Sequence, residues 1–208
     1  MSITLNASTS SGFVQSADNS GEIELQSNGT TALKVNTNEG IQILNCLGVG
    51  NATPSTSGAG ITFPATQSAS SDANTLDDYE EGTFTPFVRG ASTQGTASYN
   101  RQIGIYTKIG NRVFFTISIE WLSGTGTGAL GLGGLPFTQN GNSYDIPYAV
   151  SECGDIAWDA NYMPTPIGIH NTTVIFLNAS RVGASGSSIN TSYDAAGSFS
   201  MTGHYRIT

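Results

Sequence analysis

Apolar and polar residues alternate with a period of two in several separate stretches of the chain. Side chains of a β-strand point to opposite faces of a sheet with this period, whereas a helix repeats its apolar positions every three to four residues. The clearest alternation lies in residues 111–122, where the odd positions from Val113 to Trp121 are apolar. The pattern predicts a strand with one buried face, as in an antiparallel sandwich.

A second strand is predicted just before this one. Its Ile103, Ile105 and Ile109 share one side, and Gly110-Asn111 follow as a turn. Two strands joined by so short a turn are expected to pair as a hairpin.

The segment that contains this hairpin, residues 77–208, holds further strand patterns between turns rich in Gly, Asn and Ser. Residues 174–177 are wholly apolar, which suits a central strand buried on both faces. Residues 199–207 alternate, with His204 and Arg206 on the outward side. Roughly eight to ten short strands predict an antiparallel β-sandwich of the jelly-roll type for this C-terminal domain.

Residues 1–50 predict a smaller β-arm, in which Asn28-Gly29 suits a type I′ turn between two alternating stretches. One face of this β-arm collects six apolar side chains: Ile23, Leu25, Leu33, Val35, Ile41 and Ile43. An isolated sheet of this size is marginal, because folding buries too little surface. The face is therefore expected to pack on the C-terminal domain, on identical copies around a symmetry axis, or on another protein. The linker that follows favours identical copies.

Residues 51–76 are rich in Ser, Thr, Ala and Gly, and Ile61 and Phe63 are their large apolar residues before Leu76. We interpret this segment as an extended linker or strap, with Ile61 and Phe63 as further attachment candidates. The fold class predicted is all-β: an N-terminal β-arm, an extended linker and a C-terminal sandwich.

An acidic junction opens the C-terminal domain, because Asp77, Asp78, Glu80 and Glu81 stand within five positions around one tyrosine. The spacing of a calcium-binding loop is absent. We interpret these carboxylates as a solvated turn, or as partners for Arg side chains of a neighbouring subunit. The strand predicted at 83–88 contains Pro86, which cannot donate to a sheet, so this strand is expected at an edge or with a bulge.

Charged residues make up 11% of the chain, with 7 basic and 15 acidic residues and a formal net charge of −8. The basic residues stand singly, whereas nucleic acids and anionic membranes attract clustered Lys and Arg. We therefore expect no nucleic acid and no membrane as partner, but proteins or glycans. The first residues lack the basic and apolar segments of a signal peptide, so assembly in a cytoplasm is expected.

The glycine pattern at 126–131, GTGALG, matches that of a dinucleotide-binding loop. Such a loop opens a helix, whose N-terminus holds the pyrophosphate. Here Gly133, Gly134 and Pro136 stand where the helix would run. A loop or a glycine-rich strand is predicted instead.

A carboxylate group surrounds a tryptophan at Glu152, Asp155, Trp158 and Asp159. Paired carboxylates beside an aromatic ring could serve acid–base chemistry on a sugar. Spacing alone fixes neither their separation nor a raised pKa, so a surface loop with a half-buried tryptophan is favoured. Trp158, Asp155 and Asp159 are kept as candidate contacts to a surface ligand.

No catalytic residue, metal ligand or cofactor is predicted. His170 and His204 have no Cys, Asp or Glu neighbour at ligand spacing. Cys46 and Cys153 lie far apart without CxxC or Cys/His spacing and are expected to be unrelated, buried thiols. A dyad of Cys153 with a histidine has no support beyond the presence of both residues. We expect a protein that is not an enzyme.

Three phrases resemble virion proteins of tailed bacteriophages. Residues 76–86, LDDYEEGTFTP, resemble the opening of a domain in those proteins. Residues 106–110, YTKIG, and 133–137, GGLPF, resemble later phrases, in the same order as in the family. The β-rich segment upstream also resembles the segments that precede such domains. The family includes tail fibres, head fibres and capsid decoration (cement) proteins, usually trimeric.

The resemblance implies a non-enzymatic, homotrimeric protein of the virion surface. A tail fibre usually adds an anchoring domain and a long shaft, so a length of 208 residues favours a capsid decoration protein or head fibre that binds and stabilises the major capsid protein. The alternative is a short tail fibre or receptor-binding protein, attached to tail proteins, whose loops around Trp158 contact a host glycan. A depolymerase fragment is a third possibility.

Overall fold

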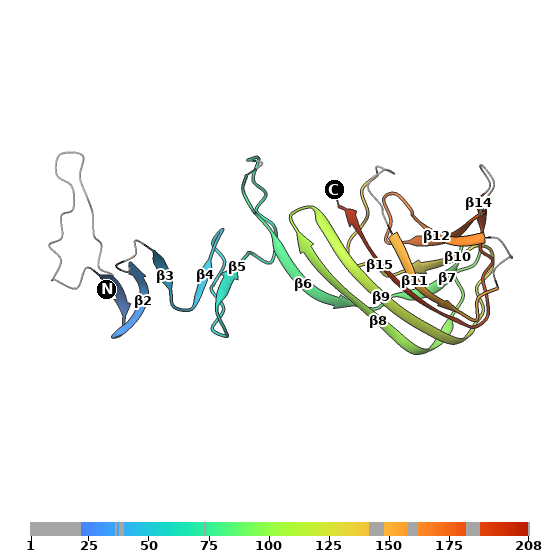
Figure 1. Ribbon diagram of the computed structural model, residues 1–208, viewed down its shortest axis with the longest axis horizontal. Coiled ribbons are helices and arrows are strands. Elements are labelled where there is room, and N and C mark those ends of the chain that lie inside the picture. The colour runs from blue at the N-terminus through green and yellow to red at the C-terminus, as the bar shows by residue number, and fades with distance from the viewer. Residues whose placement is uncertain are drawn as a thin grey trace. The chain divides into compact units, whose positions relative to one another are not determined.

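The computed structural model describes residues 22–35, 37, 40–72, 74–141, 148–157, 162–181 and 188–207. The chain divides into two compact units, Met1–Thr66 and Gln67–Thr208, called here unit 1 and unit 2. Every regular element in the described residues is a strand (Figure 1), which confirms the all-β prediction. Within these ranges no helix has the length and apolar character that a membrane span requires.

Unit 1 contains a three-stranded antiparallel sheet and a short parallel pair. The sheet consists of β1 (Ile23–Ser27), β2 (Thr30–Val35) and β3 (Ile41–Ile43). Positive φ angles of 50° at Asn28 and 75° at Gly29 form the turn predicted from the Asn-Gly pair. The parallel pair consists of β4 (Cys46–Gly48) and β5 (Gly60–Thr62). Strand β5 lies inside the range predicted as linker.

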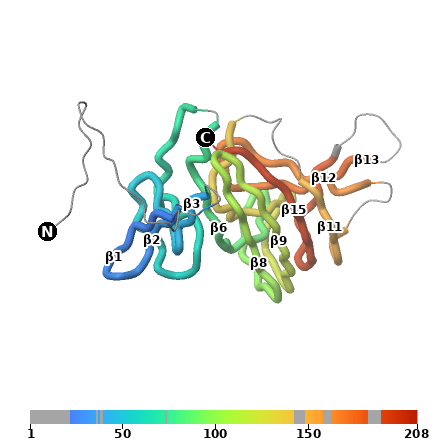
Figure 2. The backbone as a smooth tube through the Cα atoms, turned by 60° about the vertical axis from the view of Figure 1, so that its left-hand side comes forward, coloured from blue at the N-terminus to red at the C-terminus, as the bar shows by residue number. Residues whose placement is uncertain are grey.

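The described residues of unit 2 form two five-stranded antiparallel sheets. The first has the order β11 (Tyr148–Gly154), β15 (Gly197–Arg206), β9 (Arg112–Gly124), β8 (Ala97–Ile109) and β6 (Tyr79–Phe84). The second has the order β12 (Tyr162–Gly168), β13 (Ile175–Arg181), β10 (Leu130–Gly133) and β7 (Phe87–Gly90), with β14 (Ser188–Asn190) also paired to β13. Figure 2 shows β8, β9, β15 and β11 running alongside one another.

The two sheets share one hydrophobic core. The first sheet contributes the odd positions of β9 and three residues of β15: Val113, Phe115, Ile117, Ile119, Trp121, Phe199, Met201 and Tyr205. The second sheet contributes Val88, Leu130, Leu132, Ile175 and Leu177. A cluster that takes side chains from the inner faces of two sheets is the core of a β-sandwich. The predicted buried face of β9 is confirmed.

The strand predicted at 83–88 does not exist as one strand. The chain leaves the first sheet at Phe84 and enters the second at Phe87, so Thr85 and the buried Pro86 connect the two sheets. Proline has no backbone N–H to donate, and the ladder breaks where it stands. Both β6 and β7 lie at the edge of their sheets, which is where the proline was expected to confine the strand.

The apolar run 174–177 begins with the buried Val174, just before β13, and continues into β13. This strand is central as predicted, but it is not buried on both faces. Ile175 and Leu177 point into the core, whereas Phe176 is half-buried on the outer face. There its ring covers Gly131 of the neighbouring β10, at which a Cβ would lie 2.8 Å from ring carbons of Phe176.

The predicted hairpin of β8 and β9 is confirmed, and Ile103, Ile105 and Ile109 do share one face. That face is the outer one. The two-residue turn Gly110-Asn111 pairs Ile109 with Arg112, and paired residues point to the same side of a sheet. The isoleucines therefore lie with the polar positions of β9, away from the core.

Gly90, the last residue of β7, provides a test of how closely the backbone packs in unit 2. A Cβ at this position would collide with backbone atoms of Thr127 and Thr93, which pair with each other nearby. Backbone atoms cannot move aside as a side chain can, so we expect Gly90→Ala to lower the free energy of unfolding of unit 2 by about 1–3 kcal/mol. Urea denaturation measures it.

Gly154→Ala is the matched control, because a Cβ there would meet chiefly the hydroxyl of Ser198, which can rotate. An equal loss of stability in the two variants would contradict the prediction.

Candidate interaction surfaces

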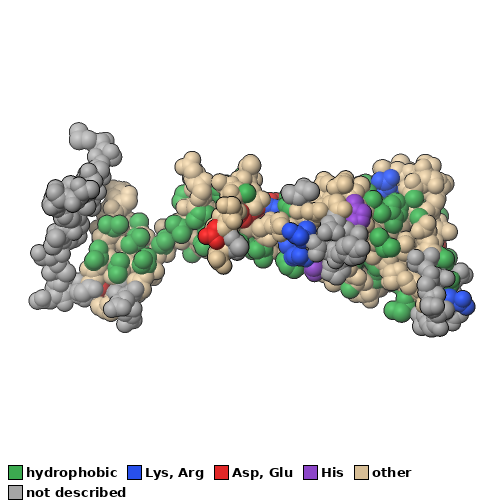
Figure 3. Space-filling model, turned by 90° about the horizontal axis from the view of Figure 1, so that it is seen from above, with side chains coloured by type: hydrophobic (Ala, Val, Ile, Leu, Met, Phe, Trp, Pro, Cys, Tyr) green, Lys and Arg blue, Asp and Glu red, His purple; other side chains and the backbone are tan. Residues whose placement is uncertain are grey.

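The six apolar residues predicted in the β-arm lie on one face of the β1–β2–β3 sheet. They form two rows across the strands: Ile23, Val35 and Ile41 in one, and Leu25, Leu33 and Ile43 in the other. Figure 3 shows hydrophobic side chains gathered over this part of unit 1. Ile41 is 70% exposed and Leu25 53%. The structure thus brings the predicted set together and leaves much of its surface uncovered within one chain; we call it the β-arm face.

The opposite side of the same sheet is polar. Lys34 lies 2.6 Å from a carboxylate oxygen of Glu22 and 3.7 Å from one of Glu24. Gln26 and Thr31 donate hydrogen bonds to Glu24, and these bonds are the main reason that its pKa lies below the ordinary value. A sheet with one solvated polar face and one exposed apolar face has a surface that another molecule can cover.

The two other attachment candidates lie at the β4–β5 pair. Ile61 of β5 is 56% exposed and stands beside Leu47 of β4, which is 41% exposed. Phe63 is half-buried just after β5. Ile61 therefore adds to the exposed apolar surface of unit 1, and Phe63 does so less.

The structure contradicts the interpretation of the acidic junction as a solvated turn. Its carboxylates have partners inside the chain. Asp78 is buried and forms an ion pair with the buried Lys108. Glu80 accepts a hydrogen bond from the hydroxyl of Tyr106, and Glu81 accepts one from Tyr79. Asp77 accepts two more, from the backbone N–H of Ser70 at 2.7 Å and the side chain of Gln67 at 3.2 Å.

These contacts join the three phrases that resemble phage proteins. Gly82 of the first phrase leaves room for the ring of Tyr106 of the second, since a Cβ there would lie 2.6 Å from the tyrosine hydroxyl. Phe137 of the third phrase packs edge-on against Tyr106, with ring centroids 5.4 Å apart. Its ring also lies 5.5 Å from the Lys108 ammonium. We call Asp78, Glu80, Gly82, Tyr106, Lys108 and Phe137 the junction cluster.

Burial sets the electrostatics of the junction cluster. It raises the pKa of Tyr106 to about 12, and the adjacent Glu80 carboxylate adds to the effect. Burial also lowers the pKa of Lys108, an effect that the nearby Asp77 carboxylate opposes. A phenol that stays protonated and donates to a carboxylate fastens two strands together and offers no base at neutral pH.

The candidate sugar contacts lie mostly outside the described residues. Trp158 and Asp159 belong to a segment that the structure does not describe. Asp155 is exposed just after β11, with a positive φ of 55°, and Glu152 is exposed on β11.

Cys153 and His204 do not form a dyad. Cys153 pairs with the buried Phe199 and packs against the core, whereas His204 pairs with Phe114 on the outer face of the same sheet. Burial raises the pKa of the Cys153 thiol to about 11, so it is not a nucleophile at neutral pH. In the described ranges no group of three or more His, Cys, Asp or Glu could hold a metal ion.

Sequence patterns alone did not draw attention to the outer face of β6, β8 and β9, where several large apolar side chains are exposed. A signal was nevertheless present. A two-residue turn at 110–111 fixes which residues of β8 and β9 are opposite each other, and it pairs Ile109 with Arg112 and not with Val113.

Lys108 tests the junction cluster. We expect Lys108→Met to lower the free energy of unfolding of unit 2 by about 3–5 kcal/mol, because it leaves the carboxylate of Asp78 buried without its counter-charge. Adding Asp78→Asn should restore much of the loss. The measurement is urea denaturation of the full chain.

Arg101→Met serves as the control, since Arg101 pairs with Glu120 at 3.5 Å on the outer face of the sheet, where the two side chains are 35% and 31% exposed. An exposed pair contributes about 0–1 kcal/mol. A similar decrease in the free energy of unfolding in Lys108→Met and Arg101→Met would show that the buried pair stabilises the fold no more than the outer pair does.

Comparison with known proteins finds similarity in structure alone. The sequence matches no family model and no curated protein. The chain is similar to the crystal structure of the Dettilon tailspike protein (gp208), with a TM-score of 0.54 and 18% sequence identity. The match covers 77% of this chain and 31% of that one, so this chain spans less than a third of the tailspike's length. At this level of identity, the two proteins share a fold.

Proposed function

We propose that this chain is a virion protein of a tailed bacteriophage, displayed on the virion surface as a tail fibre or tailspike component after assembly in the host cytoplasm. The observation that carries the proposal is the fold shared with a tailspike protein over 77% of the chain. The three phage-like phrases support it, because the residues that carry the resemblance are those that meet in the junction cluster.

The same observation changes which of the two functions inferred from the sequence is preferred. Chain length favoured a capsid decoration protein bound to the major capsid protein. A fold shared with a tailspike instead favours the alternative, a component attached to tail proteins that can contact a host glycan. Capsid decoration becomes an outcome of the experiment below.

The proposed role is attachment without catalysis. Each carboxylate of the acidic junction has a structural partner: Asp77, Asp78, Glu80 and Glu81. A carboxylate held in this way by its own chain is not poised for acid–base work on a substrate. The exposed apolar surface of the chain is what the proposed function uses.

The β-arm face is the proposed self-association surface, in a homotrimer as the family resemblance implies. Its two rows of three side chains expose Ile41, Leu25 and Ile23 to water in a single chain. Removing this surface from water favours association by about 25 cal/mol for each Å² buried. Identical copies supply a matching apolar face without any further partner.

The location on the virion is tested with the phage that encodes this chain. Gold-labelled antibody against the chain should mark the tail in electron micrographs, and the purified chain should adsorb to host cells and not to undecorated heads. Label on the head, with stoichiometric binding that raises head stability, would overturn the tail placement in favour of capsid decoration.

Ile43 tests the role of the β-arm face. Ile43→Asp places a charge where two copies would bury it, so the concentration at which the assembly dissociates should rise about a hundredfold. Sedimentation equilibrium of the full chain measures this concentration.

Gln42→Asp is the matched control, because Gln42 stands on the polar face of the same strand, in register with Lys34. The role is refuted if both variants dissociate at the wild-type concentration.

A further inference from the structure

Unit 2 has an exposed apolar surface of its own. It lies on the outer face of the first sheet and consists of Tyr79, Ile103, Ile105, Ile109 and Phe114, whose side chains are between 39% and 53% exposed. These residues centre on β8 and its two neighbours, β6 and β9. We call them the β8 face. Soluble monomers seldom expose a contiguous apolar patch of more than a few hundred Å², and larger patches mark interaction surfaces.

Charge is distributed unevenly across this surface. On the β6 side stands Glu81, in register with Thr107 and, through it, with Phe114. On the far side stand Arg112 of β9 and Arg206 of β15, paired with each other, and His204, whose Nδ1 lies 2.6 Å from Arg112. Near the β8–β9 turn, one border of the β8 face is thus acidic and the opposite border basic. Farther from the turn, the second border also carries Glu152 of β11, in register with Ser200. A surface of this kind is complementary to a second copy of itself.

The dimensions of the sheet suit a protein partner. Strands β8 and β9 have 13 residues each. Strand β6 has 6 residues and β15 has 10. At about 3.3 Å per residue and about 4.8 Å between strands, the four strands from β6 to β15 cover about 670 Å². This area lies within the range of about 600–1,000 Å² that each partner buries in a stable protein–protein interface.

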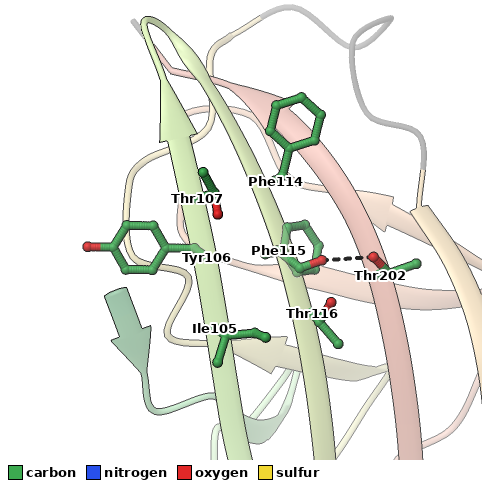
Figure 4. A pocket seen from close by; sticks show the side chains of 7 residues that line it. All are labelled: Ile105, Tyr106, Thr107, Phe114, Phe115, Thr116 and Thr202. Atoms are coloured by element: carbon green, nitrogen blue, oxygen red, sulfur yellow. Dashed lines mark hydrogen bonds between the residues drawn. The ribbon is translucent and has the colours of Figure 1, made fainter. Parts of the chain in front are cut away.

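The relief of the surface also points to a protein. Two hollows of about 170 and 340 Å³ flank Phe114, one lined by Ile105, Thr116 and Thr202 among others, and the other by Ala149, Thr202 and His204 among others. Figure 4 shows the first, with side chains from β8, β9 and β15 around it. Both are open depressions in a sheet, whereas a small-molecule site encloses most of its ligand. Hollows beside a projecting aromatic ring suit the side chains of a facing sheet.

We propose that the β8 face binds the β8 face of a second copy of this chain, with the Glu81 border of one copy against the Arg112 and Arg206 border of the next. The isoleucines of β8 form the dry centre of the contact, and the oppositely charged borders set its orientation. The proposal holds for any location of the protein on a virion. Where the β-arm face also associates, the two contacts reinforce each other, because the second forms within an assembly that the first has made.

Sedimentation equilibrium of the full chain tests the contact. Ile105→Lys should raise the dissociation concentration about tenfold or more, as expected for a central interface residue. Ile167→Lys is the matched control: this isoleucine is 44% exposed, against 50% for Ile105, and lies on the outer side of the other sheet. Equal dissociation concentrations for these two variants would overturn the proposal, as would a wild-type chain that stays monomeric at every concentration.

A charge exchange tests the orientation. Glu81→Lys and Arg112→Glu should each weaken the assembly, since each places like charges opposite one another at the contact. The double variant Glu81→Lys/Arg112→Glu should return the dissociation concentration to within about threefold of the wild type, because the two borders are again complementary. A double variant as weak as the single variants would overturn the proposal. Recovery also shows that the single variants had not simply failed to fold.

Discussion

The ammonium of Lys108 and the carboxylate of Asp78 form a buried ion pair in unit 2. Each group remains charged there because the opposite charge lies against it. This requirement places the segment before β6 against the turn of the β8–β9 hairpin, where the N–H of Gly110 also donates to the carbonyl of Asp78 at 2.9 Å. The register of β6 on β8 follows, with Glu80 opposite Lys108 and Gly82 opposite Tyr106. The acidic junction, which looks like a surface loop in the sequence, therefore holds β6 against the β8–β9 hairpin.

Each unit has a sheet with an apolar surface that the described residues of the chain leave uncovered. In unit 1 a three-stranded sheet has no second layer over the β-arm face among the described residues. In unit 2 the core is complete, yet the outer side of β8 carries isoleucines where an isolated sandwich would place polar residues. The carboxylates of the acidic junction serve the fold. In the acidic junction charge holds the fold together, and the uncovered apolar surface is what the proposed contacts use.

Local patterns were sufficient to predict what depends on neighbours in sequence. The Asn28-Gly29 turn, the buried odd positions of β9 and the shared face of the six β-arm residues all follow from alternation and turn geometry. Long-range pairings were not predictable in this way. Nothing near Asp78 in the sequence indicates Lys108, and the change of sheet at Pro86 depends on the second sheet that receives β7. The turn at 110–111 does determine that Ile105 points to the outer face of the first sheet. The apolar residues of β8 alone do not indicate which face they occupy.

Strand β15 is the last strand of unit 2 in the sequence, yet it lies inside its sheet, between β9 and β11. During synthesis the ribosome therefore releases β8 and β9 long before the strand that completes their sheet, and the partial sandwich exposes core side chains such as Phe115 and Ile117 meanwhile. The hairpins of unit 1 need only contacts close in sequence, and such contacts form early and fast. Under the proposed association through the β-arm face, unit 1 meets other nascent copies while unit 2 is still incomplete, which couples assembly to folding in time.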